Sequence, residues 1–384
     1  MKTTDQYSRR KFIHTSLSLG VSAASAFALS GLASSCQGKT QPESKSEEKT
    51  SAPQVGKKLG IALVGLGQYS SEQLAPALKE TTHCYLAGAV TGTPDKAEKW
   101  KKKYDLPHDN VYSYETFDAI KDNPDIDIIY VVLPNAMHKE YVVRAARAGK
   151  HVICEKPMAI TVADCDEMIA ACKQAGKMLS IGYRLHFDPY NKEMMRLGQD
   201  KIFGEIKRME AENGQKKVDG WRLHKELAGG GPLMDLGIYC VQGVRYTTGL
   251  EPIAVIAQEG QKTDLKKFSE VEESITWQME MPGGIVAACK SSYSENYNKL
   301  RAEAAKGYFE LSPAYAYKGI RGKTTDTSLN FKSINQQAAQ MDDFAQAIKD
   351  GRPTPVPGEM GRQDVKILQA IYESMRTKQR VAIA

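Results

Sequence analysis

The chain has 384 residues, of which 41% are hydrophobic, and this is enough for two ordinary globular domains. Its formal net charge of +6 is mild, and its lysines follow solvated helical stretches without interleaved aromatic residues, so nucleic acid is not an expected partner. The seven histidines and seven cysteines show no metal-ligand spacing, so we expect no metal site. Most cysteines are predicted to be small core residues, and Cys165 and Cys172 to be buried rather than disulfide-bonded.

The N-terminal segment is typical of an export signal. Arg9 and Arg10 precede a weakly apolar run at 17–32, which is short of the roughly 20 strongly apolar residues that a membrane span needs. We therefore expect a twin-arginine signal peptide at 1–36. The run ends in a sequence similar to a bacterial lipoprotein site with Cys36 as the lipidated residue, so a lipid anchor and periplasmic release both stay open. Residues 37–57 are polar and aperiodic, which predicts a flexible linker.

A glycine-rich turn follows the first apolar strand. The strand at 59–64 leads directly into Gly65-Leu66-Gly67-Gln68-Tyr69, and a helical stretch begins near Ser71. This order is typical of the Rossmann fingerprint, in which the glycines allow a tight turn and the helix start faces a pyrophosphate. Ser70 stands where the third glycine is usual, so a plain β-α turn is the alternative.

The end of the second strand bears on the choice of nucleotide. NAD-specific folds usually present an acidic residue there to the ribose hydroxyl. Here the strand at 85–90 ends at Thr91, with Lys96 close behind, and a hydroxyl and a cation suit a 2′-phosphate. NADP is therefore predicted over NAD, with Asp95 as the feature that keeps NAD open.

Further strands and helices alternate up to residue 182. The run at 126–133 is apolar apart from Asp127, as expected of a parallel strand that is covered on both faces. Residues 58–182 are therefore predicted to form a Rossmann domain with a parallel sheet. The remaining predicted elements are a helix at 140–148, a strand at 151–154, a helix from a capping box at Thr161–Asp164 to Gln174, and a strand at 178–182.

The second half has a different pattern, and together the two halves predict an α/β protein. Residues 183–384 are predicted to form an α+β domain for substrate binding and oligomerisation, with an open, mostly antiparallel sheet. Two late helices, at 335–349 and 362–378, are expected to pack back against the body. The predicted strands are 205–212, 252–258, 275–281, 285–290 and 300–304, with a hairpin turn at Pro282-Gly283-Gly284.

A lysine follows the strand at 151–154. The carboxyl ends of strands in an open α/β sheet face the crevice in which ligands bind, so Lys156 is placed where it could reach a substrate. A solvated loop with one surface charge is the alternative for this stretch taken alone.

Five motifs in order make the chain, from about residue 59 to its C-terminus, resemble the Gfo/Idh/MocA oxidoreductases. They are Gly65-x-Gly67, Leu133-Pro134-Asn135-x-x-His138, Glu155-Lys156-Pro157-Met158, Gly182-Tyr183-Arg184 and Asp235-Leu236-Gly237-Ile238-Tyr239. Within that family, the stretches Trp221–Leu223, Glu226–Gly231 and Ser291–Ser294 are most similar to the periplasmic glucose-fructose oxidoreductase subgroup.

The resemblance implies a nicotinamide cofactor between the two domains and a catalytic set of Lys156, Asp235 and Tyr239. Many relatives carry histidine at the last position, whereas the glucose-fructose subgroup carries tyrosine. His186 is a candidate for a hydrogen bond to sugar. The candidate cofactor-binding residues are Gly65, Leu66, Gly67, Gln68, Tyr69, Thr91, Lys96, Tyr114, Leu133, Pro134, Asn135, His138, Glu155, Lys156, Arg184, Trp221, Arg222 and Tyr317.

The residue types at the catalytic positions suit sugar oxidation. Asp235 and Tyr239, four residues apart on a predicted helix, would share one face. Removing hydride from a sugar carbon needs a base for the hydroxyl proton, and the charge of Lys156 would favour the phenolate of Tyr239. Asp235 would orient the sugar hydroxyls. Alternatively, Tyr239 is a core aromatic residue and Asp235 a helix cap.

Export and a nicotinamide cofactor together restrict the reaction. No pool of the cofactor exists outside the cytoplasm, so we expect tightly bound NADP that is restored in place. The predicted reaction is a ping-pong cycle in which an aldose becomes a lactone and a second carbonyl sugar takes the hydride. Alternatives are a redox-neutral glycosidase or epimerase, a simple NADP-dependent sugar dehydrogenase, and a sugar-binding protein without catalysis. Relatives form dimers or tetramers, so a homodimer or homotetramer is expected.

Overall fold

The computed structural model describes residues 56–383. The predicted signal peptide at 1–36, the lipidation site at Cys36 and nearly all of the 37–57 linker lie outside these residues. Within them, no helix is both long and apolar enough to cross a membrane.

A six-stranded sheet contains the glycine turn and Lys156, in the order β3-β2-β1-β4-β5-β6 with every neighbouring pair parallel. Both β1 and β4 are buried along their whole length, as strands covered on two faces should be. The strand order reverses between β1 and β4, which is where open α/β sheets bind ligands. The elements are β1 (Leu59–Val64), α1 (Ala75–Ala77), β2 (Cys84–Val90), α2 (Pro94–Tyr104), β3 (Val111–Tyr112), β4 (Ile128–Val131), α3 (His138–Arg147), β5 (His151–Cys154), α4 (Val162–Gln174) and β6 (Leu179–Ile181).

The second half of the chain forms a nine-stranded sheet, in the order β14-β13-β12-β11-β7-β10-β9-β8-β15. Its neighbouring strands are antiparallel except for β7 and β10, so the predicted mostly antiparallel sheet is confirmed. Buried and open positions alternate along β9, which means that one face is covered and the other is not. The strands are β7 (Ile206–Gly214), β8 (Ala254–Glu259), β9 (Ser274–Glu280), β10 (Val286–Ser292), β11 (Tyr297–Ala304), β12 (Gly307–Leu311), β13 (Gly322–Thr324), β14 (Ser328–Leu329) and β15 (Val381–Ala382).

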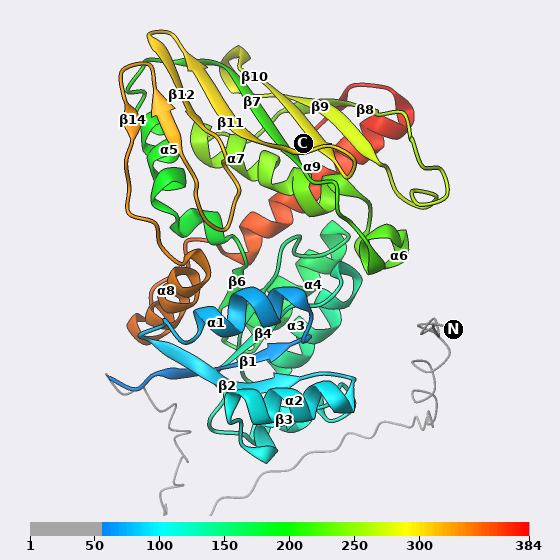
Figure 1. Cartoon of the computed structure of the whole chain (residues 1–384), viewed down its shortest axis with the longest axis vertical. Helices are drawn as coiled ribbons and strands as arrows, with labels where there is room; N and C mark the ends of the chain where they lie inside the picture. Colours follow the sequence, from blue (N-terminus) through cyan, green and yellow to red (C-terminus); the bar gives the residue numbers. More distant parts are fainter. Residues whose placement is uncertain (1–55, 384) are drawn as a thin grey trace, which may run out of the picture. The chain divides into compact units, whose positions relative to one another are not determined.

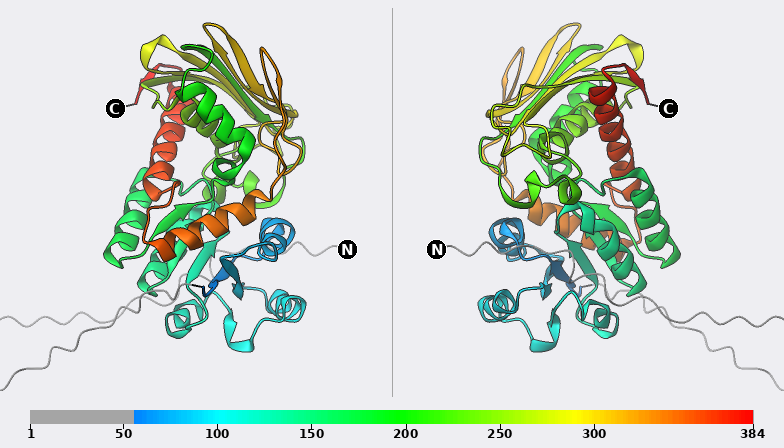
Figure 2. Two further views of the ribbon diagram at one scale, coloured as in Figure 1. Left: turned by 90° about the vertical axis from the view of Figure 1, so that its left-hand side faces the viewer. Right: turned by 90° about the vertical axis from the view of Figure 1, so that its right-hand side faces the viewer.

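Helices α5, α7 and α9 cover one face of this sheet (Figures 1 and 2). Helix α7 packs on β7, and α9 packs on β8 and on α4 of the parallel-sheet part. Helix α8 instead supplies Met341 and Phe344 to the core around β1. Both late helices therefore pack back against the body. The helices are α5 (Pro189–Gln199), α6 (Lys225–Ala228), α7 (Ile238–Thr248), α8 (Gln336–Asp350) and α9 (Gly358–Thr377).

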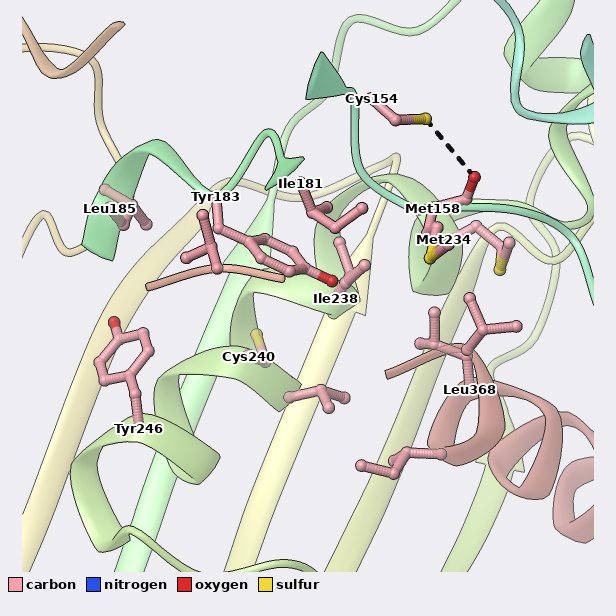
Figure 3. Close-up of a cluster of buried hydrophobic side chains, with 14 of the residues drawn as sticks. Cys154, Met158, Ile181, Tyr183, Leu185, Met234, Ile238, Cys240, Tyr246 and Leu368 are labelled. Carbon is pink, nitrogen blue, oxygen red and sulfur yellow. Dashed lines mark hydrogen bonds between the residues drawn. The ribbon is translucent and has the colours of Figure 1, made fainter. Parts of the chain in front are cut away.

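A buried cluster joins the end of the parallel sheet to α7 and α9 (Figure 3). Met158 and Ile181 come from the loop after β5 and from β6, while Ile238 begins α7 and Leu368 lies on α9. Since all four side chains are at most 1% exposed, this junction is closely packed. It fixes Lys156, two residues before Met158, relative to the start of α7.

Several local predictions are confirmed. Thr161 accepts a hydrogen bond from the backbone N–H of Asp164 and so caps α4. The turn between β9 and β10 uses positive φ at Gly283 and Gly284, as the hairpin prediction requires. The six described cysteines are all buried and form no disulfide.

Three local features differ from the predictions. The helix after the glycine turn is a π-helical turn, Ser70–Leu74, that continues into the short α1. Asp235 lies in another π turn, Leu233–Gly237, rather than in a regular α-helix. The sequence patterns did not indicate β3 and β12–β15, of which four have two or three residues. Such strands are too short for an alternating pattern to stand out.

Candidate active site

The Lys156 side chain lies where the two sheets' loops meet. Its ammonium donates a hydrogen bond of 2.8 Å to the backbone oxygen of Asp235 and lies 3.5 Å from Asp235 Oδ1. The same ammonium lies 4.6 Å from the centre of the Tyr239 ring. The three predicted catalytic residues therefore lie together, with Asp235 and Tyr239 both next to the Lys156 ammonium.

The carboxylate of Asp235 is held by two further side chains. Arg222 Nε donates to Oδ2 at 3.0 Å, and the Tyr293 hydroxyl donates to the same oxygen at 3.2 Å. Burial by itself would raise the pKa of Asp235, but Arg222 and Lys156 outweigh burial and lower its pKa below the usual value. Asp235 is therefore an ionised acceptor in a partly enclosed site.

The Tyr239 ring lies between two cations. Besides Lys156, the Arg184 guanidinium lies 5.2 Å from the centre of the ring and 4.4 Å from the centre of the Tyr317 ring. Arg184 is buried, and donates to the backbone oxygen of Tyr315 at 2.6 Å and to Gln336. Its Nε is buried without a hydrogen-bond partner among the described residues. A bound nucleotide or substrate could accept a hydrogen bond from this donor.

The π turn explains how Asp235 and Tyr239 both reach Lys156. It widens the backbone just before α7, and Gly237 packs so closely that a Cβ there would lie 2.9 Å from Leu233 and 3.0 Å from Trp277. π-Helical turns are frequent at functional sites because they shift side chains out of the regular helical register.

The glycine turn after β1 fits a bound dinucleotide. Gly65 has φ +94°, and a Cβ there would lie 2.3 Å from the backbone oxygen of Val132, so no other residue fits. By contrast, nothing lies within 4 Å of a Cβ placed on Gly67, and Gly67 and Gln68 are exposed. Ser70 donates from its hydroxyl to the Gly65 oxygen at 2.6 Å, which braces the turn where a third glycine is usual. The turn is therefore packed against the protein at Gly65 and exposed at Gly67, and this exposed backbone is where a pyrophosphate could approach.

The other predicted members of this turn and of the β4 loop lie beside it. Leu66 and Leu133 are buried, and Pro134 is partly exposed. The Tyr69 ring lies 6.0 Å from the Tyr317 ring, so both line the region near Arg184.

The end of β2 carries the residues predicted to select NADP. Thr91 is buried and its hydroxyl accepts the backbone N–H of Thr93 at 3.3 Å, whereas Lys96 is exposed on the first turn of α2. Tyr114 lies against Gly92, where a Cβ would be 2.8 Å from its ring. These side chains are grouped at one strand end, and Lys96 is free to reach an anion there.

Three predicted cofactor residues hold the loops of the site through hydrogen bonds to the protein. His138 is fully buried, with Nδ1 2.9 Å from the Pro157 oxygen and Nε2 2.9 Å from the Leu133 oxygen, so it ties the loop after β4 to that after β5. Burial lowers its pKa. Asn135 donates to the Ala228 oxygen at 2.7 Å and so holds α6.

The third, Glu155, is also buried. It accepts the Tyr130 hydroxyl at 2.7 Å, and burial raises its pKa, partly offset by that hydrogen bond. The hydrogen bonds that these three residues make to the protein position the two loops.

Trp221 and Arg222 are also expected near the cofactor. Arg222 contacts Asp235, as described, and its guanidinium lies 4.7 Å from the Trp221 ring. Sequence reasoning missed Tyr293 as the other donor to Asp235. Extending the alternation of β10 by one residue puts Tyr293 on the covered face with Cys289 and Ser291, which is the signal that could have found it.

His186 lines a narrow pocket next to the catalytic cluster. Its Nε2 lies 2.9 Å from Gln242 Oε1, and burial lowers its pKa to about 4. The walls of the pocket are Lys156, Tyr183, Leu185, His186, Ile238, Tyr239, Gln242 and Tyr246.

No group of three or more potential metal ligands is found in the described part of the chain. The site itself contributes one ionised carboxylate, one ammonium and one phenol, together with a glycine turn that fits a dinucleotide.

Comparisons with known proteins agree with this arrangement. Residues 59–183 match an oxidoreductase family with an NAD-binding Rossmann fold, and residues 192–310 match the Gfo/Idh/MocA C-terminal domain. A crystal structure of aldose-aldose oxidoreductase from Caulobacter crescentus, complexed with glycerol, is 43% identical with a TM-score of 0.83, and the match covers 85% of this chain and 100% of that one.

Two proteins of known activity are more distant in sequence. D-xylose 1-dehydrogenase [NADP(+)] of Haloarcula marismortui is 26% identical over 84% of this chain and 92% of that protein. D-glucoside 3-dehydrogenase of Escherichia coli is 26% identical over 85% of this chain and 97% of that protein. The chain belongs to the Gfo/Idh/MocA family of oxidoreductases.

Proposed function

We propose that this protein is an exported sugar oxidoreductase that retains NADP, oxidises an aldose to its lactone and passes the hydride to a second carbonyl sugar. The contact of the Lys156 ammonium with both Asp235 and Tyr239 carries the proposal. The 43% identity to an aldose-aldose oxidoreductase supports sugars as both substrates.

Lys156 and Asp235 are the groups that would hold the reacting sugar. An ammonium has three N–H donors, and one is used by the Asp235 backbone oxygen, so others can donate to a sugar oxygen. Arg222 and Tyr293 both donate to Asp235 Oδ2. Among the described residues, Oδ1 has only Lys156 nearby, at 3.5 Å, and it can accept a hydrogen bond from a sugar hydroxyl.

Tyr239 is the group that would move the proton. Oxidation of an aldose removes a hydride from its anomeric carbon and a proton from the anomeric hydroxyl, and the bound nucleotide supplies hydride acceptance and donation. Tyr239 takes the proton and later returns it to the carbonyl oxygen of the second sugar, so the protein ends unchanged. The two cations beside its ring supply a positive field for this transfer.

Retention of NADP follows from export. The twin-arginine segment would carry a folded protein with its nucleotide to the periplasm, released or held by lipid on Cys36, and the protein would act as a homodimer or homotetramer. Thr91 and Lys96 at the end of β2 support NADP, as does the likeness to an NADP-dependent D-xylose dehydrogenase.

The same likeness favours a second candidate, a simple NADP-dependent sugar dehydrogenase that releases its reduced nucleotide. The two candidates differ in whether the nucleotide leaves. A redox-neutral glycosidase or epimerase would differ from both because it yields neither lactone nor alditol.

The deciding experiment identifies the nucleotide and the products. The exported protein is purified, one portion is denatured and its released dinucleotide identified, and another is incubated with sugar pairs without added nucleotide. We expect NADP in near-stoichiometric amount, and lactone and alditol in equal amounts. Lactone that forms only with added NADP would favour the dehydrogenase, and cleavage of an aryl glycoside would favour the redox-neutral enzyme.

A further inference from the structure

His186 lines the narrow pocket beside Lys156 and Tyr239. The proposed reaction assigns no function to its ring. Tyr183, Leu185, Ile238 and Tyr246 form much of its wall and belong to the buried cluster of Figure 3. Because these neighbours are fixed by the core, the orientation of His186 is fixed with them. The His186 ring packs edge-on against the Tyr246 ring, with 5.3 Å between their centres.

A buried carboxylate behind the pocket sets the orientation of Gln242. Asp364 on α9 is completely buried and accepts hydrogen bonds from the Tyr183 hydroxyl, from Gln242 Nε2 and from Arg245. Asp364 Oδ2 receives both the Tyr183 hydroxyl and Gln242 Nε2, and Oδ1 receives Arg245. In this arrangement the amide NH₂ of Gln242 faces Asp364 and its carbonyl Oε1 faces His186.

The orientation of Gln242 in turn fixes the tautomer of His186. Oε1 is an acceptor, so the proton must be on His186 Nε2, 2.9 Å away. Burial lowers the pKa of His186 to about 4, so the ring is neutral at physiological pH and Nδ1 carries a lone pair. Nδ1 makes no hydrogen bond to any residue that the structure describes.

We propose that His186 Nδ1 accepts a hydrogen bond from one hydroxyl of the bound sugar, and that Asp364 and Gln242 hold the tautomer that makes this possible. His186 is then a specificity-determining residue, and Gln242 and Asp364 are positioning residues. The proposal rests on the proposed function, since it takes the ligand of this pocket to be a sugar. A hydroxyl can donate to this nitrogen, whereas a hydrogen or a fluorine in its place cannot.

The test compares a parent sugar with its series of monodeoxy and deoxyfluoro analogues. For the wild type, we expect one ring position at which both analogues lose about tenfold or more in kcat/KM, because a buried acceptor is left unpaired. In His186→Phe, activity toward the parent should fall, and the penalty at that one position should shrink to about twofold or less. Penalties at the other positions should not change.

Two further variants change the penalty at this sugar position in ways that a purely structural role of His186 would not predict. Gln242→Leu keeps the imidazole but frees its tautomer, so the penalty at the same position should fall to an intermediate value. His186→Asn keeps a side-chain acceptor and should restore part of the discrimination. Thermal melting and nucleotide content of each variant establish that it is folded and loaded, and if His186→Phe is not, His186→Asn and Gln242→Leu decide.

Isothermal titration of sugars into the protein separates this inference from the proposed function. A wild type that turns sugars over but shows no position coupled to His186 overturns the inference alone, and so does a deoxyfluoro analogue that equals the parent. A wild type that binds sugars with the coupled discrimination but does not oxidise them overturns the proposed function alone. A wild type that neither binds nor oxidises sugar overturns both.

Discussion

Two enclosed aspartates near α7, one in the π turn before it and one on α9, behave in opposite ways. Asp235 has two cations beside it, Arg222 and Lys156, and its pKa is lowered although burial opposes this. Asp364 has one, Arg245, with two neutral donors, and burial raises its pKa despite that cation. Its side chain is fully buried, whereas that of Asp235 is 16% exposed.

The difference shows how one residue type serves two purposes in one fold. A second cation and some contact with solvent keep Asp235 charged next to the pocket, where it can bind a ligand. Asp364 lies deeper and joins Tyr183, Gln242 and Arg245 into a framework behind the pocket. The comparison makes separate predictions for activity and for stability.

The largest effect is expected for Lys156→Met, which removes the ammonium from both Asp235 and Tyr239. We expect kcat/KM to fall by about 10³-fold, within the range of residues that assist proton transfer. Steady-state kinetics with the best sugar pair measure it. Lys139→Met, which breaks a partly exposed ion pair with Asp164, is the matched control and should keep full activity. A Lys156→Met enzyme with a tenth of wild-type activity would contradict the account.

Removing Arg222, the other cation beside Asp235, should lower kcat/KM and shift its pH dependence. Arg222→Met leaves Asp235 with Lys156 alone, so its pKa rises, and the acid limb of kcat/KM should move to higher pH. At neutral pH we expect a loss of about 10²-fold, with Arg222→Lys restoring part of it. An acid limb that stays in place in Arg222→Met would mean that Asp235 does not control it.

Asp364→Asn should reduce stability rather than chemistry. We expect about 2 kcal/mol less free energy of unfolding, the cost of a lost hydrogen bond to a charged group. Urea titration measures it. Asp166→Asn, at an exposed pair with Arg362, is the control and should leave the free energy of unfolding nearly unchanged.

The two aspartates should also differ in how their stability contributions depend on pH. The raised pKa of Asp364 means that its contribution is full below the unfolded value of about 3.9 and is lost as pH rises through the native pKa. The lowered pKa of Asp235 means the reverse: its contribution is present above about 3.9 and lost as pH falls through the native pKa.

Unfolding titrations at several pH values test this opposition. The stability difference between wild type and Asp364→Asn should grow toward acid pH, and that between wild type and Asp235→Asn should shrink. Parallel slopes for the two variants would remove the distinction between the two sites.

The smallest effect is expected for Tyr293→Phe. It removes one of two donors from Asp235 Oδ2, and Arg222 remains on that oxygen. We expect a fall of about fivefold in kcat/KM, equal to a net hydrogen bond of about 1 kcal/mol. Tyr308→Phe, on the opposite face of the sheet, is the control. A loss as large as that of Arg222→Met would make Tyr293, not the guanidinium, the main support of Asp235.

Much of the fold could be predicted because its signals are local. The apolar run of β1 with Gly65, and the continuous burial of β4, indicated a parallel nucleotide-binding sheet without any tertiary information. The position of Lys156 after β5 likewise predicted that it would lie at the ligand edge of that sheet.

The site was predicted in part, because its remaining contacts are long-range. Arg222, Asp235 and Tyr293 come from separate segments, and no periodicity in any one of them reports the others. In the π turn at Leu233–Gly237, Gly237 packs closely against Trp277 of β9, which is 40 residues further along the chain. The contact of His138 with the loop after β5 is long-range in the same way, and no local pattern in the sequence indicates it.

The most direct measurement of the central claim follows a deuterium atom from one sugar to the other. The purified protein receives an aldose deuterated at its anomeric carbon and an unlabelled carbonyl sugar, with no added nucleotide, and the products are analysed by mass spectrometry. A retained nucleotide served by Lys156, Asp235 and Tyr239 predicts lactone and a singly deuterated alditol in equal amounts over many turnovers. Turnover that stops after one equivalent, or an alditol without deuterium, would contradict the account.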